Sequence, residues 1–116
     1  MAVMVLALVR DLMLRSRIEG VAETLGVACT SAATLEIARA RAAEASPSLV
    51  LVDLSDRHFP PDETLAAMRA AAPAARIVAF ASHVDLKAFK AARAAGFDQA
   101  LSRSEFTARL PELLKA

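Results

Sequence analysis

At 116 residues the chain has the length of one domain, able to bury about two-thirds of its unfolded surface without disulfides or metals. Its 14 basic and 13 acidic residues are interspersed and leave a net charge of +1, which excludes the strongly basic surface typical of nucleic-acid and anionic-membrane binders. The single cysteine, Cys29, cannot form an internal disulfide and is expected to be a buried thiol in a reducing cytoplasm.

The apolar run 1–9 opens the chain. It is too short to cross a bilayer, because a spanning helix needs about 20 apolar residues. It also lacks the basic leader and the cleavage site of a signal peptide. We therefore predict a buried strand over 3–9, no membrane partner and a cytoplasmic location.

Amphipathic stretches and short apolar runs alternate after this strand. Leu14, Ile18, Val21 and Leu25 recur at helical spacing, and Gly26 ends the helix that they predict. Further strands are predicted at 27–30, 49–52, 77–81 and 97–101, each followed by an amphipathic segment. Five strands alternating with five helices predict an α/β domain over 1–116, with a parallel sheet covered on both faces.

Capping residues separate several of these segments. Ser31 and Asp85 are expected to cap the helices that follow them. The sequence leaves two alternatives for the last helix: it is capped by Ser104, or it begins at Thr107. A start near Ser104 would leave Pro111 well inside the helix, where it removes a backbone donor and should kink the chain.

The strand 49–52 consists of four consecutive apolar residues, which is typical of a strand buried on both faces. Asp53 follows directly, and ligands of open α/β folds bind at the carboxyl ends of such strands. Asp53 is therefore a candidate nucleophile, metal ligand or anchor for a cation.

Three segments carry a resemblance to a known family. Segment 79–86 forms a strand with a polar end, 94–96 a helix ending in Ala-Gly, and 97–103 a strand finishing in a basic residue. With the strand before Asp53, they make the chain similar to receiver domains of the response-regulator family, whose simplest member is CheY. The resemblance covers nearly the whole length. It implies a flavodoxin-like doubly wound sheet of strand order 2-1-3-4-5 and makes Asp53 the counterpart of the phosphorylated aspartate.

The resemblance also implies what the chemistry of a working receiver needs. The aspartate takes a phosphoryl group from a histidine kinase, and Mg²⁺ neutralises the charge between the two anions. The family holds Mg²⁺ with an acidic pair after the first strand. It clamps the phosphoryl oxygens with a lysine after the fifth strand, senses them with a hydroxyl after the fourth, and reports the change through an aromatic residue on the fifth.

This chain departs from the family at the metal site. Val9 and Arg10 align with the acidic pair. Shifting the alignment by one residue places Asp11 at one of the two acidic positions, so that Asp11 and Asp53 become the candidate metal ligands. Arg10 then stands at the other acidic position. A guanidinium there repels a cation and offers Asp53 a partner. Two unit charges about 4 Å apart attract by roughly 4 kcal/mol at an effective dielectric near 20, before desolvation. We therefore expect Asp53 to pair with Arg10 or with Arg103.

The other family positions have also changed. Arg103 stands at the lysine position, Ala81 at the hydroxyl position with Ser82 as the available substitute, and Ala100 at the aromatic position. The expected binding residues at the strand ends are Asp53, Arg10, Ser82 and Arg103. No catalytic residue is assigned beyond the candidate phosphoacceptor Asp53.

Basic residues recur at three-residue spacing along the predicted fourth helix. The resemblance implies that helix 4, strand 5 and helix 5 form the surface that meets a protein partner or a second copy of the chain. The residues expected on that surface are Lys87, Lys90, Arg93, Gln99 and Glu105.

Other kinds of site are disfavoured. His58 and His83 have no cysteine or acidic partner at ligand spacing, so we expect no zinc. Ser82 lacks the strained Gly-x-Ser-x-Gly turn of a hydrolase, and the three glycines form no phosphate-cradling loop.

These features predict a stand-alone, degenerate receiver that acts by protein binding rather than as an enzyme, with a histidine kinase or an effector as partner and no cofactor. Because the chain ends where the predicted fold closes, we expect no output domain. One alternative is an active receiver that is phosphorylated on Asp53 with Mg²⁺ as cofactor. A second is a flavodoxin-like binder of a small molecule.

Overall fold

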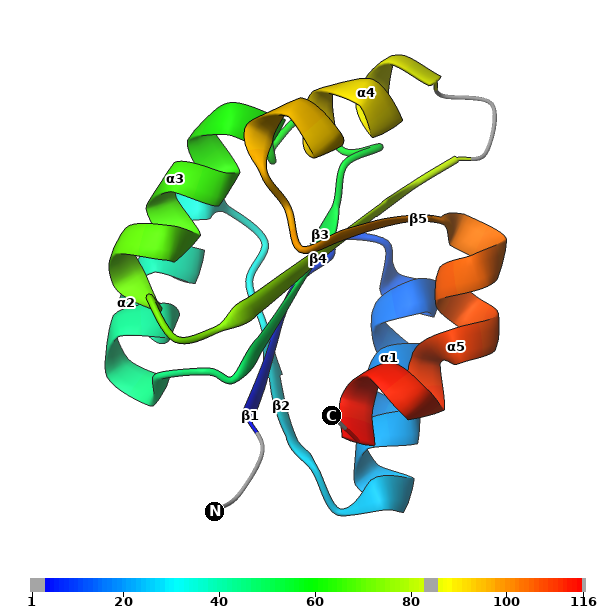
Figure 1. The fold of residues 1–116 in the computed structure, drawn as a ribbon. Helices are drawn as coiled ribbons and strands as arrows, with labels where there is room; N and C mark the ends of the chain where they lie inside the picture. The colour runs from blue at the N-terminus through cyan, green and yellow to red at the C-terminus, as the bar shows by residue number, and fades with distance from the viewer. Residues whose placement is uncertain (1–3, 83–85, 116) are drawn as a thin grey trace.

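The computed structural model describes residues 4–82 and 86–115. Five parallel strands form one sheet in the order β2-β1-β3-β4-β5 (Figure 1). The strands are β1 (Met4–Leu8), β2 (Ala28–Ser31), β3 (Leu49–Asp53), β4 (Arg76–Ala81) and β5 (Gln99–Ser102). The predicted α/β class and the flavodoxin-like strand order 2-1-3-4-5 are confirmed.

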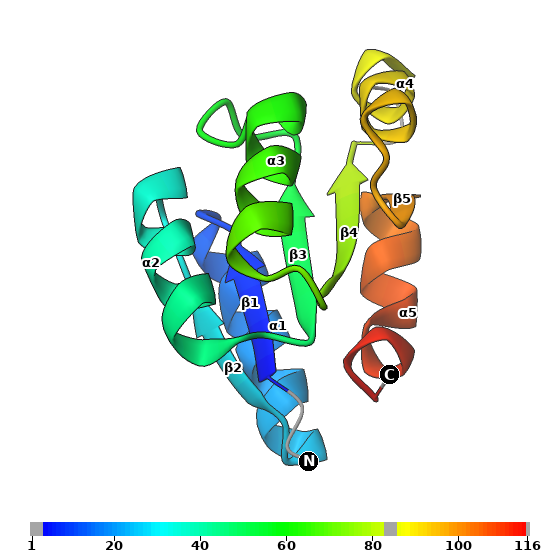
Figure 2. The ribbon, with the colours of Figure 1, turned by 60° about the vertical axis from the view of Figure 1, so that its left-hand side comes forward.

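Helices cover both faces of the sheet, as Figures 1 and 2 show. On one face lie α1 (Leu12–Leu25) and α5 (Arg103–Lys115). On the other lie α2 (Leu35–Ala45), α3 (Pro61–Ala71) and α4 (Leu86–Ala95). Within the described part of the chain, no helix has the length and hydropathy needed to cross a membrane.

The sheet separates two apolar cores. All five residues of β3 are buried; Leu49 and Leu51 belong to the core under α1 and α5, and Val50 and Val52 to the core under α2, α3 and α4. This is the burial expected of a central parallel strand. Phe80 of β4 stacks on Phe106 of α5 with ring centroids 4.0 Å apart. Both cores hold β3 in place, so the position of its last residue, Asp53, is fixed by packing from two sides.

The helix that follows β2 begins differently from the prediction. Ser31 is the last residue of β2 rather than a cap, so that prediction was wrong. Thr34 caps α2 instead, because its side-chain oxygen accepts a hydrogen bond from the Ile37 N–H at 3.1 Å. Asp85, the other predicted cap, lies outside the described residues, as does His83.

The last helix begins at Arg103, earlier than either predicted start. Ser102 and Glu105 form a reciprocal pair: the Glu105 N–H donates to Ser102 Oγ, and the Ser102 N–H donates to Glu105 Oε1, both at 3.1 Å. Pro111 lies inside the helix, which continues to Lys115. The capping pair and the buried face of α5 therefore stabilise the helix by more than the loss of one backbone hydrogen bond at Pro111 destabilises it.

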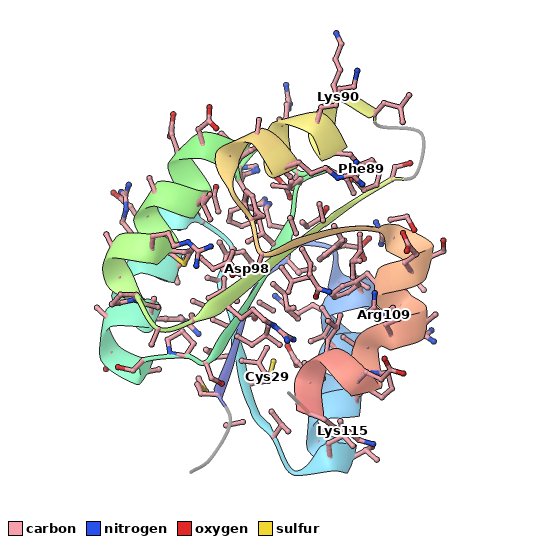
Figure 3. The ribbon with its side chains drawn as sticks, in the orientation of Figure 1. Cys29, Phe89, Lys90, Asp98, Arg109 and Lys115 are labelled. Carbon is pink, nitrogen blue, oxygen red and sulfur yellow. The ribbon has the colours of Figure 1, made fainter. Side chains whose placement is uncertain are left out.

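Cys29 lies on the edge strand β2 and is half-buried rather than fully buried (Figure 3). Burial raises the pKa of its thiol to about 11. The thiol is therefore protonated at neutral pH and is a poor nucleophile.

Candidate functional site

The carboxyl ends of the strands meet at one edge of the sheet, where polar loops surround an open depression. Its volume is about 500 Å³, and it is lined by Arg10, Asp11, Asp53, Ser55, Asp56, Arg57 and His58. The loop after β1 supplies the first two residues, and β3 with its following loop supplies the others. The structure thus brings together Asp53, Arg10 and Asp11, as the sequence predicts.

Asp53 is the buried carboxylate of this depression. It is 5% exposed, and its Oδ1 accepts a hydrogen bond from the Ser55 N–H at 3.0 Å. Burial raises the pKa of Asp53, and the nearby charges of Asp56 and Asp11 add to that rise. The Ser55 N–H and the positive charge of Arg103 oppose it without reversing it. Asp53 is therefore the least readily ionised of the three acids.

Arg10 is held by Asp56 rather than by Asp53. Its Nε lies 3.4 Å from Asp56 Oδ2, and its Nη1 donates to the Ala33 carbonyl at 3.0 Å. Asp56 also accepts from the backbone N–H of His58 at 2.9 Å. Although burial works in the opposite direction, hydrogen bonds from His58 and the charge of Arg10 lower the pKa of Asp56. Asp56 is thus an ionised carboxylate with its partners already in place.

Arg103 is likewise held by Asp11. Its Nη2 donates to Asp11 Oδ2 at 2.8 Å, while Asp11 Oδ1 caps α1 by accepting from the Leu14 N–H at 3.1 Å. The hydrogen bond from Arg103 and the one from Leu14 lower the pKa of Asp11. Both oxygens of this carboxylate are occupied by protein donors.

The predicted ion pair of Asp53 with Arg10 or Arg103 was therefore wrong in its partner. Among the described residues, Asp53 has no basic side chain within 4.0 Å. Asp56 and Asp11 are more exposed than Asp53, so an arginine can pair with them while its guanidinium stays hydrated. Pairing with Asp53 would require burying that charge.

Replacing Asp53 with asparagine is expected to stabilise the protein at neutral pH. Burial raises the pKa of Asp53 in the folded state, so the folded protein holds this proton more tightly than the unfolded chain does. The free energy of unfolding of the wild type is therefore highest below the ordinary pKa of about 4 and falls as the pH rises through the higher folded pKa. Asparagine stays neutral and keeps an oxygen for the Ser55 N–H. Urea unfolding of both proteins should show a difference in the free energy of unfolding, in favour of Asp53→Asn, that widens from about pH 4 upward. A constant gap would contradict a raised pKa.

Ser82 follows β4 and lies at the border of this depression. Its backbone N–H donates to Ser55 Oγ at 3.3 Å. With Arg103, Ser82 lines a neighbouring depression rather than the one that contains Asp53. The four predicted binding residues therefore gather at one edge of the sheet but divide between two hollows.

Comparison with known proteins gives a likeness of fold. No family model and no curated protein matches the sequence. The chemotaxis protein CheY4 of Vibrio cholerae superposes with a TM-score of 0.83 at 18% identity, over 99% of this chain and 98% of that one. A CheY-like receiver domain protein of Methanospirillum hungatei superposes with a TM-score of 0.77 at 17% identity, over 99% and 98%.

This chain has the receiver fold. A third solved structure with that fold, a response regulator of Burkholderia pseudomallei with a phosphorylated aspartic acid, a calcium ion and citrate, matches with a TM-score of 0.78 at 18% identity. The match covers 98% of this chain and 66% of that one.

The two acids beside Asp53, Asp11 and Asp56, are both engaged by guanidinium groups in this structure. Mg²⁺ needs oxygen ligands in octahedral array. Within residues 4–82 and 86–115, no group of three or more His, Cys, Asp or Glu side chains could hold a metal ion. Of the candidate pair, Asp53 is buried and Asp11 is bound by Arg103 and by the α1 backbone. Guanidinium groups hold the two acids that flank Asp53.

The other positions that distinguish receivers are small side chains in this structure. Ala81 is buried at the end of β4, and Ala100 is half-buried on β5 against the core under α4. Neither carries a hydroxyl or an aromatic ring.

The predicted interaction residues lie on α4, β5 and α5. Lys87, Lys90 and Arg93 are exposed, and Lys90 projects outward from α4 while Phe89 points toward the sheet (Figure 3). Gln99 is half-buried, and Glu105 is exposed but bound to Ser102. Glu105 therefore has a structural role whether or not it also meets a partner.

Sequence reasoning missed Asp56 and the capping role of Asp11. Asp11 directly precedes an amphipathic helix, which is a recognisable capping signal. Asp56 lies in a turn with no periodic pattern, so nothing local marks it as the partner of Arg10.

Proposed function

We propose that this chain is a signalling module of the two-component type that acts by binding a protein partner, without Mg²⁺-dependent phosphorylation and without enzymatic activity. One observation carries the proposal: Arg10 and Arg103 neutralise the two carboxylates beside Asp53. A cation that entered the depression would have to displace two guanidinium groups and would meet their charge.

The proposed binding surface is the exposed side of α4, β5 and α5. Lys87, Lys90 and Arg93 give it positive charge, and Leu86 adds an apolar side chain that is 67% exposed. An acidic surface on a histidine kinase or on a downstream effector would complement it, and a second copy of the chain could use the same surface. The proposed location of this module is the cytoplasm.

Incubation with acetyl phosphate and Mg²⁺ tests the proposal. We expect the intact mass of the wild-type chain to stay unchanged, because no metal bridges the phosphoryl donor and Asp53. A receiver known to be phosphorylated serves as the positive control in the same mixture. A phosphoryl adduct that forms on the wild type but not on Asp53→Asn would refute the proposal and establish the alternative.

The alternative is an active phosphoacceptor, and one observation favours it. Asp53 lies at the end of β3 in an open depression, and the charge of Arg103 reaches it strongly enough to oppose the rise of its pKa. In this alternative Asp11 would leave Arg103 and serve as the lone metal carboxylate. Arg103 would then be free to neutralise a phosphoryl group.

A further inference from the structure

A second depression lies beside the acidic one, where α1 and α5 run side by side (Figure 1). Its volume is about 510 Å³, within the range of small-molecule sites. It is lined by Arg17, Ser82, Arg103, Ser104, Thr107 and Ala108. The lining contains two guanidinium groups and, among the described residues, no carboxylate.

Two contacts separate the hollows. The Asp11–Arg103 ion pair, at 2.8 Å, joins an acid of the first depression to a base of the second. The hydrogen bond from the Ser82 N–H to Ser55 Oγ, at 3.3 Å, makes a second link across the same border. Among the residues that the structure describes, the carboxylates line the first depression, and the second is lined by two guanidinium groups.

Arg17 supplies one of these two guanidinium groups. It is exposed on α1, and its side chain has no hydrogen bond or ion pair with any other described residue. Arg103 gives one nitrogen to Asp11 and has further N–H groups for a second acceptor. The Ser82 hydroxyl adds a donor. Ser104 Oγ lies 3.4 Å from Ser102 Oγ, where either hydroxyl can donate, and Thr107 already donates to the Arg103 carbonyl at 2.9 Å.

We infer that this second depression binds a phosphate monoester of a small molecule. Paired guanidinium groups with hydroxyl donors match the tetrahedral dianion of a phosphate monoester. Ala108 offers apolar contact to the organic part. The inference goes beyond the proposed function, because it requires neither phosphorylation of Asp53 nor a metal ion.

A titration monitored by ¹⁵N NMR tests this site with inorganic phosphate and then phenyl phosphate as probes, against chloride at equal ionic strength. We expect saturable shifts at the Ser104 and Thr107 amides, and tighter binding of phenyl phosphate than of inorganic phosphate. Because an anion must compete with Asp11 for Arg103, Arg17 should contribute most. Arg17→Gln is expected to weaken binding by about tenfold, the loss of one charge-assisted contact.

Arg109→Gln is the control, since Arg109 is an exposed arginine on α5 outside the lining (Figure 3). It should leave the affinity unchanged. Chemical shifts that do not saturate, or an equal loss of affinity in both variants, would indicate non-specific attraction of the anion to positive charge and would overturn the inference. Loss of binding in Arg10→Gln but not in Arg17→Gln would place the anion in the acidic depression and overturn it as well.

Discussion

Replacing Arg10 with aspartate is expected to strengthen the binding of Mg²⁺ to this protein. The change removes the guanidinium that binds Asp56 and adds a carboxylate at the edge that also bears Asp11 and Asp53. A unit charge about 5 Å from a divalent ion contributes roughly 7 kcal/mol at an effective dielectric near 20, before desolvation. Reversing that charge should strengthen binding by at least about tenfold after desolvation.

Isothermal titration with Mg²⁺ measures the effect, and two variants separate its causes. Arg10→Gln removes the positive charge without adding a ligand, so we expect an intermediate affinity. Arg109→Asp makes the same charge change outside the depression and should behave as the wild type does. Wild-type affinity equal to that of Arg10→Asp would show that Arg10 does not oppose the metal, and the phosphoacceptor alternative would then be favoured.

The largest loss of stability is expected from replacing Phe106 with alanine. Phe106 is fully buried and stacks on Phe80 with ring centroids 4.0 Å apart and planes 16° from parallel. Removing such a ring from a core costs about 3–5 kcal/mol through lost burial and the cavity that remains. Because domains of this size are stable by only about 5–15 kcal/mol, the variant should be close to unfolding.

The same substitution should also loosen the strand end that carries Asp53. Phe80 is the partner of Asp53 in the β3–β4 register, and its carbonyl accepts the Leu54 N–H at 2.9 Å. Urea unfolding measures the stability, and amide exchange at Leu54 measures the local effect. Phe106→Leu keeps most of the apolar volume, so its free energy of unfolding should fall by less than that of Phe106→Ala. A loss below about 1 kcal/mol for Phe106→Ala would contradict the packing described here.

Much of the fold follows from local patterns. The apolar run before Asp53 indicated a central strand because only helices on both faces can bury every residue of such a run, and β3 is buried throughout. Helix boundaries were less predictable. By residue type, α2 could be capped by Ser31 or Thr34, and α5 by Ser102 or Ser104. The residue that caps each helix depends on where the preceding strand stops.

The sequence predicted some members of the candidate site, among them Arg10, Asp11 and Asp53, but missed Asp56 and the pairing of the charged groups. Alternating strands and helices bring Arg10, Asp53 and Arg103 to one edge, because parallel strands all end on the same side. Which carboxylate each arginine meets depends on loop positions and on burial. Asp11 and Arg103, for example, are 92 positions apart in the chain yet lie 2.8 Å apart in space.

By itself, then, the amino-acid order determined the layered α/β architecture and the placement of a carboxylate at the end of the central strand, because hydrophobic periodicity acts within a few neighbouring residues. The strand order was implied by the family resemblance and is confirmed by the structure. Only the tertiary structure decided that Arg10 joins Asp56, that Arg103 joins Asp11, and that a second hollow opens beside Arg17. Ion pairs and cavities depend on distances of a few ångströms between distant segments, and such distances exist only after the chain has folded.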